Sequence, residues 1–304
     1  MKQALFVFHP KSGTAQIKPH LLYILNTLTR GGYRVTACPT QYAGHARELV
    51  LESAADTDLL VVSGGDGTLN EAVDALMHLP SEKRPLLGYI PSGTVNDFAS
   101  GRGIPKNMDR AADAIIGGRE FVCDVGRFGA RHFTYVAAFG AFSRVSYATP
   151  QKEKNALGLL AYLLEGIRSL PEIRPYHLTV EHDGKTVEGD FIFGLVANST
   201  SVGSFKVSRK IDISLNDGLF EVLLVREPED AVALNAILGG VLAQDFSDEH
   251  FYWVKTSRLR VRSASPLAWS LDGESGGSTL DVDIENCHDA LRLMTDKNAP
   301  VFRK

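Results

Sequence analysis

The chain has 304 residues, 44% of them hydrophobic and 22% charged, which is typical of a soluble globular protein of one or two domains. Its formal net charge of -4 argues against general nucleic-acid binding, which requires a basic surface. The three cysteines, Cys38, Cys123 and Cys287, form no Cys-x-x-Cys pair, so neither a zinc site nor a disulfide framework is predicted.

The chain has no segment that predicts export or membrane insertion. Its first ten residues lack the charged start and long apolar core of a secretory signal. The longest apolar stretches, 156–164 and 231–243, are shorter than the ~20 residues that a membrane span needs. We therefore expect a cytoplasmic protein that is not an integral membrane protein.

The N-terminal part of the chain alternates between predicted strands and predicted helices. Apolar runs predict strands, and leucines at helical spacing, as from Leu21 to Leu28, predict helices. This alternation is typical of an open parallel sheet in an α/β domain. The predicted strands are 3–9, 33–38, 59–62 and 86–90, and the predicted helices lie near 21–30, 43–55, 69–76 and 108–116.

After residue 126 the pattern changes to short β-like runs with two predicted helices, 155–170 and 228–242. We predict an α/β domain over residues 1–126 and a β-rich domain over 127–288. The sequence leaves open whether the tail, 289–304, returns to the first domain. The β-like runs are 131–137, 177–182, 186–196, 219–225, 259–261, 268–271 and 279–284.

A glycine-rich turn, Gly64-Gly65-Asp66-Gly67-Thr68, lies between a buried strand and a helix. Backbone N–H groups at such a turn bind anions, and glycine lets a phosphate approach the chain. The Asp66 carboxylate would repel phosphate unless a cation or a hydrogen-bond network offset it, so a divalent metal ion is the natural inference. The alternative is an ordinary turn in which Asp66 and Thr68 cap the helix.

A second loop, Ser92-Gly93-Thr94-Val95-Asn96-Asp97, follows the next predicted strand. Thr94 offers a hydroxyl to phosphate and Asp97 adds a carboxylate, although either Thr94 or Asn96 could simply be a helix N-cap. The carboxyl ends of parallel strands meet at one edge of a sheet, where such folds bind ligands. Together the two loops favour a nucleotide phosphate site.

Two carboxylates flank a glycine in the turn Leu271-Asp272-Gly273-Glu274. Most such turns are only solvated, but phosphoryl transfer to a hydroxyl needs a carboxylate that orients the acceptor and takes its proton. The turn Asn216-Asp217-Gly218 is a favoured turn sequence, and spacing alone gives Asp217 no metal role.

These motifs resemble those of the soluble bacterial diacylglycerol kinases, to which sphingosine and ceramide kinases are more distantly similar. The resemblance covers essentially the whole chain. It implies an α/β nucleotide domain and a β-sandwich-like lipid domain with ATP between them. It also implies ATP- and magnesium-dependent transfer of the γ-phosphoryl group to the hydroxyl of diacylglycerol or a similar lipid. The matching segments, in the family's order, are 64–68, 91–99, 123–126, 216–220 and 271–274.

The resemblance also implies roles for individual residues. Glu274 matches a proton acceptor, with Asp272 beside it as an essential carboxylate, and the sequence leaves open which of the two takes the proton. Asp217 matches a structural metal site with the carbonyls of Ser214 and Leu219, although some relatives carry Asp in place of Ser214. Asp66, Asp97 and Asp124 match an acidic network linked through water to magnesium. The residues that match ATP contacts are Thr40, Gly64, Gly65, Asp66, Gly67, Thr68, Leu69, Asn70 and Thr94.

As partners, the resemblance implies a lipid substrate at the inner membrane surface and a homodimer, with no nucleic acid. Lys152, Lys154, Arg168 and Arg174, near the predicted helix 155–170, would suit an anionic membrane surface. Diacylglycerol, undecaprenol-like alcohols, ceramide and phosphatidylglycerol all stay open as acceptors.

Two other functions compete with a lipid kinase. An NAD kinase shares the first loop but gives no reason for the segments 91–99 and 272–274. A catalytically silent lipid-binding or regulatory protein would be expected to lose a motif carboxylate, and all five are present: Asp66, Asp97, Asp124, Asp272 and Glu274.

Overall fold

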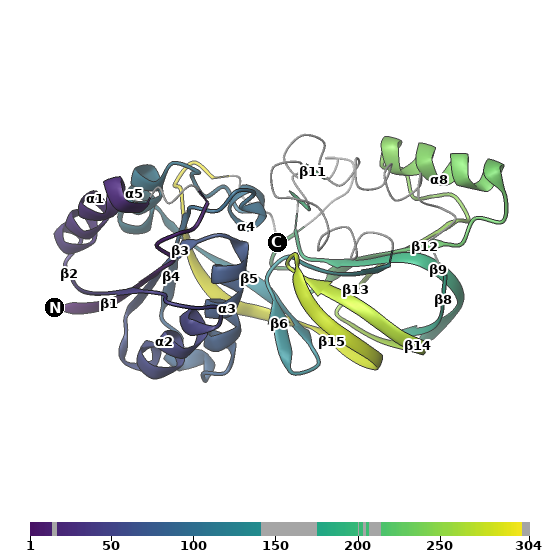
Figure 1. The fold of residues 1–304 in the computed structure, drawn as a ribbon, viewed down its shortest axis with the longest axis horizontal. Coiled ribbons are helices and arrows are strands. Elements are labelled where there is room, and N and C mark those ends of the chain that lie inside the picture. The colour runs from purple at the N-terminus through teal and green to yellow at the C-terminus, as the bar shows by residue number, and fades with distance from the viewer. Residues whose placement is uncertain (14–16, 141–174, 200, 203–204, 207–213, 300–304) are drawn as a thin grey trace. The chain divides into compact units, whose positions relative to one another are not determined.

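The computed structural model describes residues 1–13, 17–140, 175–199, 201–202, 205–206 and 214–299. The chain divides into two compact units (Figure 1). Unit 1 consists of Met1–Val125 and His288–Lys304, and unit 2 of Gly126–Cys287. The predicted helix 155–170 and the four basic residues near it lie outside the described residues.

Unit 1 is built on a parallel sheet in the order β2-β1-β3-β4, with helices between successive strands. The predicted α/β class is confirmed. Phe8 pairs with Ser63, and Gly64 with Pro91, so the carboxyl ends of β1, β3 and β4 lie side by side. The elements are β1 (Lys2–Phe8), α1 (Ile17–Arg30), β2 (Tyr33–Pro39), α2 (His45–Ser53), η1 (Ala54–Asp56), β3 (Leu59–Gly64), α3 (Asp66–Met77), η2 (Ser81–Lys83), β4 (Leu86–Pro91), α4 (Asp97–Gly101) and α5 (Met108–Gly117).

The core of unit 1 fixes the strand ends. Every residue of β3 is buried, as the apolar run predicted. On α3, Leu69, Val73 and Leu76 recur at helical spacing and are fully buried. Burying a side chain of this kind contributes about 1.5–3 kcal/mol, so the loop between β3 and α3 is held by well-packed elements on both sides.

Two long strands carry the chain between the units. β5 (Arg119–Phe128) leaves unit 1, and β15 (Glu274–Thr295) returns to it. At the end of β15, Leu293 pairs in parallel with Leu87 of β4. The tail that the sequence left unassigned therefore belongs to unit 1.

Unit 2 is an antiparallel, β-sandwich-like unit, as predicted. β8 and β7 each pair with both β9 and β14, so these strands close around a core that includes Phe133, Phe191, Phe220 and Trp269. The elements are β6 (Arg131–Phe133), β7 (Val136–Gly140), β8 (Tyr176–His182), β9 (Lys185–Ala197), β10 (Ser201–Val202), β11 (Phe205–Lys206), β12 (Phe220–Arg226), α8 (Ala231–Ala243), β13 (Phe251–Thr256) and β14 (Arg258–Leu271).

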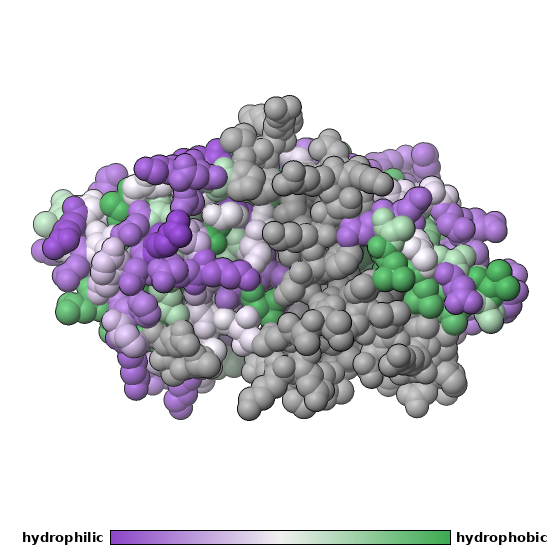
Figure 2. Space-filling model, turned by 90° about the horizontal axis from the view of Figure 1, so that it is seen from above, coloured by the Kyte–Doolittle hydropathy of each residue, from purple (hydrophilic) through white to green (hydrophobic). Residues whose placement is uncertain are grey.

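Helix α8 covers a second apolar layer of unit 2, where Ile237 and Val241 pack against Leu223 and Val225 of β12. The helix contains no charged residue. Its outer side leaves Val232 75% and Leu242 54% exposed, and Figure 2 shows hydrophobic residues along it.

Glu221 is a buried carboxylate within this unit. It lies on β12, where strand alternation places it on the same side as Leu223 and Val225, and only 1% of it is exposed. The Lys255 ammonium lies 3.3 Å from one of its oxygens. Burial raises the pKa of Glu221 to about 7, and Lys255 opposes that rise.

Glutamine at position 221 is expected to flatten the pH dependence of unit 2 stability. Between the ordinary pKa of 4.5 and about 7 the folded state binds more protons than the unfolded chain. Stability is therefore highest below that window and falls as pH rises through it, by roughly 2–3 kcal/mol. Urea unfolding of wild type and Glu221→Gln at about pH 5 and about pH 8 measures this. Both tryptophans, Trp253 and Trp269, lie in unit 2 and report on it.

Glu229→Gln, which changes an exposed glutamate, is the matched control and should keep the wild-type pH dependence. A Glu221→Gln protein whose stability still fell with pH as in wild type would rule out Glu221 as the titrating group.

Candidate active site

The loop between β3 and α3 leaves backbone donors at a helix start. Gly65 is the N-cap residue of α3, with an extended backbone and no side-chain cap. The first intrahelical bond runs from Leu69 N–H to the Gly65 carbonyl at 3.1 Å. The preceding N–H groups, of Asp66, Gly67 and Thr68, therefore have no partner within the helix, which is the arrangement that binds phosphate.

The second loop is closed by its own asparagine. The Gly93 N–H donates to Asn96 Oδ1 at 3.0 Å, and Asn96 Nδ2 donates to the Gly93 carbonyl at 2.8 Å. Asn96 is buried and left-handed, with φ of 56°. It stands at the N-cap position of α4, but its side chain makes no cap hydrogen bond and shapes the loop instead.

The two loops are in direct contact. The Gly64 carbonyl accepts hydrogen bonds from Ser92 N–H at 2.9 Å and from the Tyr89 hydroxyl at 3.0 Å. A Cβ on Gly93 would lie 2.5 Å from the Gly65 Cα, so only glycine fits there without a shift. The structure therefore brings together the loops that carry Gly64, Gly65 and Thr94.

Asp66 connects the loops in a way that the sequence did not predict. Its carboxylate accepts hydrogen bonds from Asp97 N–H at 3.1 Å and Phe98 N–H at 3.3 Å. The expectation that Asp66 caps its own helix, α3, is thus wrong, because its carboxylate caps α4. These donors offset part of its charge, so the carboxylate can lie beside a phosphate loop without a metal ion as its sole compensation.

A third loop, residues 9–13, joins this edge, and sequence reasoning had treated it as a plain turn. A Cβ on Gly13 would lie 2.5 Å from the Ser92 carbonyl oxygen, and Ser12 is buried. The His9 N–H donates to the Ser63 carbonyl, and its Nδ1 lies 3.1 Å from the Thr40 hydroxyl. Thr40 is thereby placed beside the loops. The signal for this loop was present, since it follows β1 at the same sheet edge.

Asp124 lies among residues that the tail supplies. Its Oδ1 lies 2.9 Å from His288 Nδ1 and accepts the Asp289 N–H at 2.8 Å. Ligand atoms of Asp124, His288 and Asp289 all lie within 4.8 Å of one another, so this group could hold a metal ion. The sequence gave no reason to connect these residues, because the return of the tail was unresolved.

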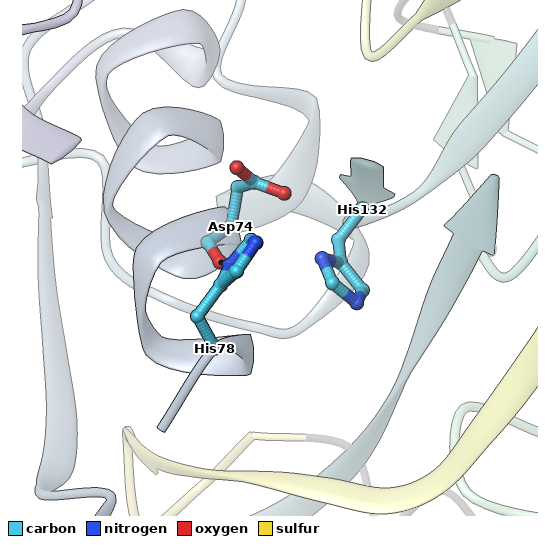
Figure 3. Close-up of side chains that lie close together, drawn as sticks. All are labelled: Asp74, His78 and His132. Carbon is cyan, nitrogen blue, oxygen red and sulfur yellow. Dashed lines mark hydrogen bonds between the residues drawn. The ribbon is translucent and has the colours of Figure 1, made fainter. Parts of the chain in front are cut away.

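The last turn of α3 carries a separate polar group (Figure 3). Arg47 Nε donates to Asp74 Oδ2 at 3.1 Å, and His78 Nδ1 lies 2.7 Å from the Asp74 carbonyl oxygen. These contacts join α2 to α3. Figure 3 also draws His132, which belongs to unit 2.

In unit 2, the turn between β14 and β15 holds its two carboxylates very differently. Asp272 is 3% exposed and left-handed, with φ of 51°. Its Oδ2 accepts from Thr134 N–H at 2.6 Å and the Thr134 hydroxyl at 2.8 Å. Its Oδ1 accepts from Tyr135 N–H at 2.9 Å and Val136 N–H at 3.0 Å. Glu274 is exposed and has no hydrogen bond from its side chain to any described residue.

This difference separates the chemistry of the two carboxylates. Burial raises the pKa of Asp272, and the donors of Thr134, Tyr135 and Val136 oppose that rise. Because both Asp272 oxygens are fully engaged, the residue is suited to fixing the turn. Glu274 is the carboxylate that is open to an acceptor hydroxyl.

Asparagine at position 272 is expected to destabilise unit 2 by about 2–4 kcal/mol, since its NH₂ group would face backbone donors and leave buried groups unpaired. Thermal unfolding followed by tryptophan fluorescence measures the loss. Glu274→Gln is the matched control and should unfold like wild type. An Asp272→Asn protein as stable as wild type would show that these contacts do not hold the turn.

The Asp217 turn is closed by its own side chains. Asp217 Oδ1 accepts the Leu219 N–H at 3.1 Å, and the Ser214 hydroxyl donates to Asn216 Oδ1 at 3.1 Å. These contacts are those of an ordinary Asx-turn, and the metal role of Asp217 stays a prediction.

Comparison with known proteins decides the family. A model described as "Diacylglycerol kinase catalytic domain" matches residues 3–128, and one described as "YegS C-terminal NAD kinase beta sandwich-like domain" matches residues 136–295. The diacylglycerol kinase of Bacillus subtilis is 36% identical over 91% of each chain. The chain belongs to the diacylglycerol kinase family. The diacylglycerol kinase of Staphylococcus carnosus is 32% identical over 98% of this chain and 96% of its own. A crystal structure of a diacylglycerol kinase from Bacillus anthracis has a TM-score of 0.80 at 25% identity, covering 97% of each chain.

Membership of this family makes the protein a kinase, with lipid kinase activity as the general activity of the family and ATP as its implied phosphoryl donor. The resemblance inferred from the motifs is confirmed. Among the described residues, no helix is long and apolar enough to cross a membrane.

Proposed function

We propose that the protein is an ATP- and magnesium-dependent kinase that phosphorylates the hydroxyl of diacylglycerol or a similar lipid, giving phosphatidic acid or an analogue. The observation that carries the proposal is the acidic turn, in which Asp272 is buried among donors while Glu274 is exposed. The named activity of the relatives from Bacillus subtilis and Staphylococcus carnosus supports this acceptor.

In this proposal the joined loops of unit 1 bind the ATP phosphates. The N–H groups at the start of α3, in the segment from Gly64 to Asn70, offer backbone donors. Thr94 adds a hydroxyl, and Thr40 lies beside them through its contact with His9. The close contact of Gly65 with Gly93 supports a backbone surface that a phosphate can approach.

Magnesium would be held by carboxylates of unit 1. Asp97 and Asp124 are 3% and 0% exposed, and an all-oxygen acidic set suits this hard cation. When bound, the ion would neutralise charge on the phosphate oxygens. Asp217, with the carbonyls of Ser214 and Leu219, is proposed as a second, structural site.

Glu274 would take the proton of the acceptor hydroxyl as the oxygen attacks the γ-phosphorus. Asp272 would hold the turn that presents Glu274 and would not exchange the proton itself. Lipid access at the inner membrane surface is part of the proposal, and the exposed apolar side of α8 supports such contact.

The test is transfer of labelled γ-phosphate from ATP to a panel of lipid hydroxyls in anionic mixed micelles, with and without magnesium and with NAD alongside. Label on diacylglycerol that Asp66→Ala abolishes would support the proposal. Label on another lipid would change the acceptor, and label on NAD alone would refute a lipid substrate. No label on any acceptor, with ATP still bound, would indicate a silent binder.

A further inference from the structure

One segment of unit 2 holds the acidic turn at both of its ends. Thr134, Tyr135 and Val136 donate to Asp272 at the start of the turn. Five residues further on from Val136 towards the N-terminus, Arg131 donates from Nη1 to the Ser275 carbonyl at 2.8 Å, directly after Glu274. Glu274 therefore lies between two anchors, and one of them is a cation.

The guanidinium of Arg131 is the uncommitted one among its neighbours. Arginine has five N–H donors, and the described residues engage Arg131 only at Ser275. Arg127, on the same β5–β6 hairpin, is paired with Glu285. The arginines of β14 are also paired with carboxylates: Arg258 with Asp283, Arg260 with Asp281 and Arg262 with Glu181.

This contrast has a chemical meaning. Arg131 is exposed, and its single bond to a neutral carbonyl fixes its place without neutralising its charge. A guanidinium fixed in this way offers paired donors to a phosphoryl group, whose oxygens carry the charge during transfer. Its contact residue is the neighbour of the proposed proton acceptor, so the charge is placed where the reaction would occur.

We propose that Arg131 binds the oxygens of the phosphoryl group during its transfer and is a further catalytic residue. This inference rests on the proposed kinase function. The bond between the γ-phosphorus and the ADP oxygen breaks with its electron pair on ADP. A new bond forms from the acceptor oxygen to phosphorus, and the acceptor proton passes to Glu274. Arg131 forms no covalent bond and stabilises charge on the phosphoryl oxygens.

The decisive variant is Arg131→Gln, because glutamine can still donate an N–H to Ser275 but carries no charge. We expect its kcat to fall by ~10²-fold or more with little change in KM for lipid, and Arg131→Lys to fall between it and wild type. Arg127→Gln, on the same hairpin, is the matched control and should retain kcat within about 2-fold. Wild-type kcat in Arg131→Gln would overturn the proposal and leave Arg131 as an anchor of the turn.

A binding measurement separates this proposal from the kinase function itself. Affinity for ADP with aluminium fluoride, a mimic of the transferring group, should fall ~10-fold or more in Arg131→Gln while affinity for ADP alone is unchanged. Equal analogue affinity in both proteins would overturn the proposal even if lipid is phosphorylated. Conversely, an analogue loss with no lipid labelled by wild type would support Arg131 and refute the lipid acceptor.

A phospholipid headgroup is the other source of the same phosphate chemistry. If Arg131→Gln instead raised KM for lipid and weakened sedimentation with phosphatidate vesicles, with kcat unchanged, the guanidinium would read headgroups. That result would overturn its role in transfer.

Discussion

Glutamine in place of Glu274 is expected to lower kcat for lipid phosphorylation by ~10²–10⁴-fold, the range that a positioned general base contributes. The physical reason is that glutamine keeps the size of the side chain but cannot take the acceptor proton. ATP affinity should be unchanged, because the proposed phosphate contacts lie in unit 1. Steady-state kinetics with diacylglycerol, together with ATP binding by calorimetry, measure both quantities.

Glu285→Gln is a suitable control, since it changes a glutamate of the same strand that pairs with Arg127. It should keep kcat within a few-fold of wild type, as expected for a partly exposed ion pair. Full activity in Glu274→Gln would refute the proton-acceptor role. Because Asp272 is already bound by Thr134, Tyr135 and Val136, it could not simply substitute, and the reaction would then need no base in this turn.

The local order of unit 1 was predictable because it rests on local signals. The apolar run at 59–62 lies inside β3, and the glycines after it end the strand where α3 begins. The same holds for 86–90 and β4. Parallel pairing of such strands then places both glycine loops at one edge, as the structure has them.

The contacts that define the candidate site depend instead on long-range pairing, which local patterns do not encode. Thr134 and Asp272 are 138 positions apart, and Asp124 and His288 are 164 apart. Nothing in the sequence near 272 tells that one of two carboxylates is buried among donors. The return of β15 to β4, on which the group around Asp124 depends, was likewise open from sequence.

Asp66 shows how a correct motif can carry a wrong local reason. The sequence placed a carboxylate at the start of α3 and offered a cap of that helix or a metal ion as its partner. The structure gives it the first N–H groups of α4, which begins 31 residues later. The same carboxylate therefore ties the two loops together, a role that requires the spatial neighbourhood of β3 and β4.

Alanine in place of Gly93 is expected to weaken ATP binding ~10-fold or more without unfolding unit 1. The added Cβ would lie 2.5 Å from the Gly65 Cα and 2.9 Å from Asn96 Oδ1. The first neighbour is backbone and cannot rotate away, so the loops must separate. That movement would displace the N–H groups at the start of α3, on which phosphate binding depends in this proposal. Calorimetric titration with ATP measures the loss, and circular dichroism checks the fold.

Gly117→Ala is the matched control, because a Cβ at this end of α5 meets no atom within 4 Å. Its ATP affinity should equal that of wild type. Gly65→Ala should fall between the two, since its Cβ would lie 3.4 Å from the Gly93 Cα, a distance that a small shift relieves. Wild-type ATP affinity in Gly93→Ala would mean that the nucleotide does not depend on contact between the loops, and the phosphate site would then have to lie elsewhere on unit 1.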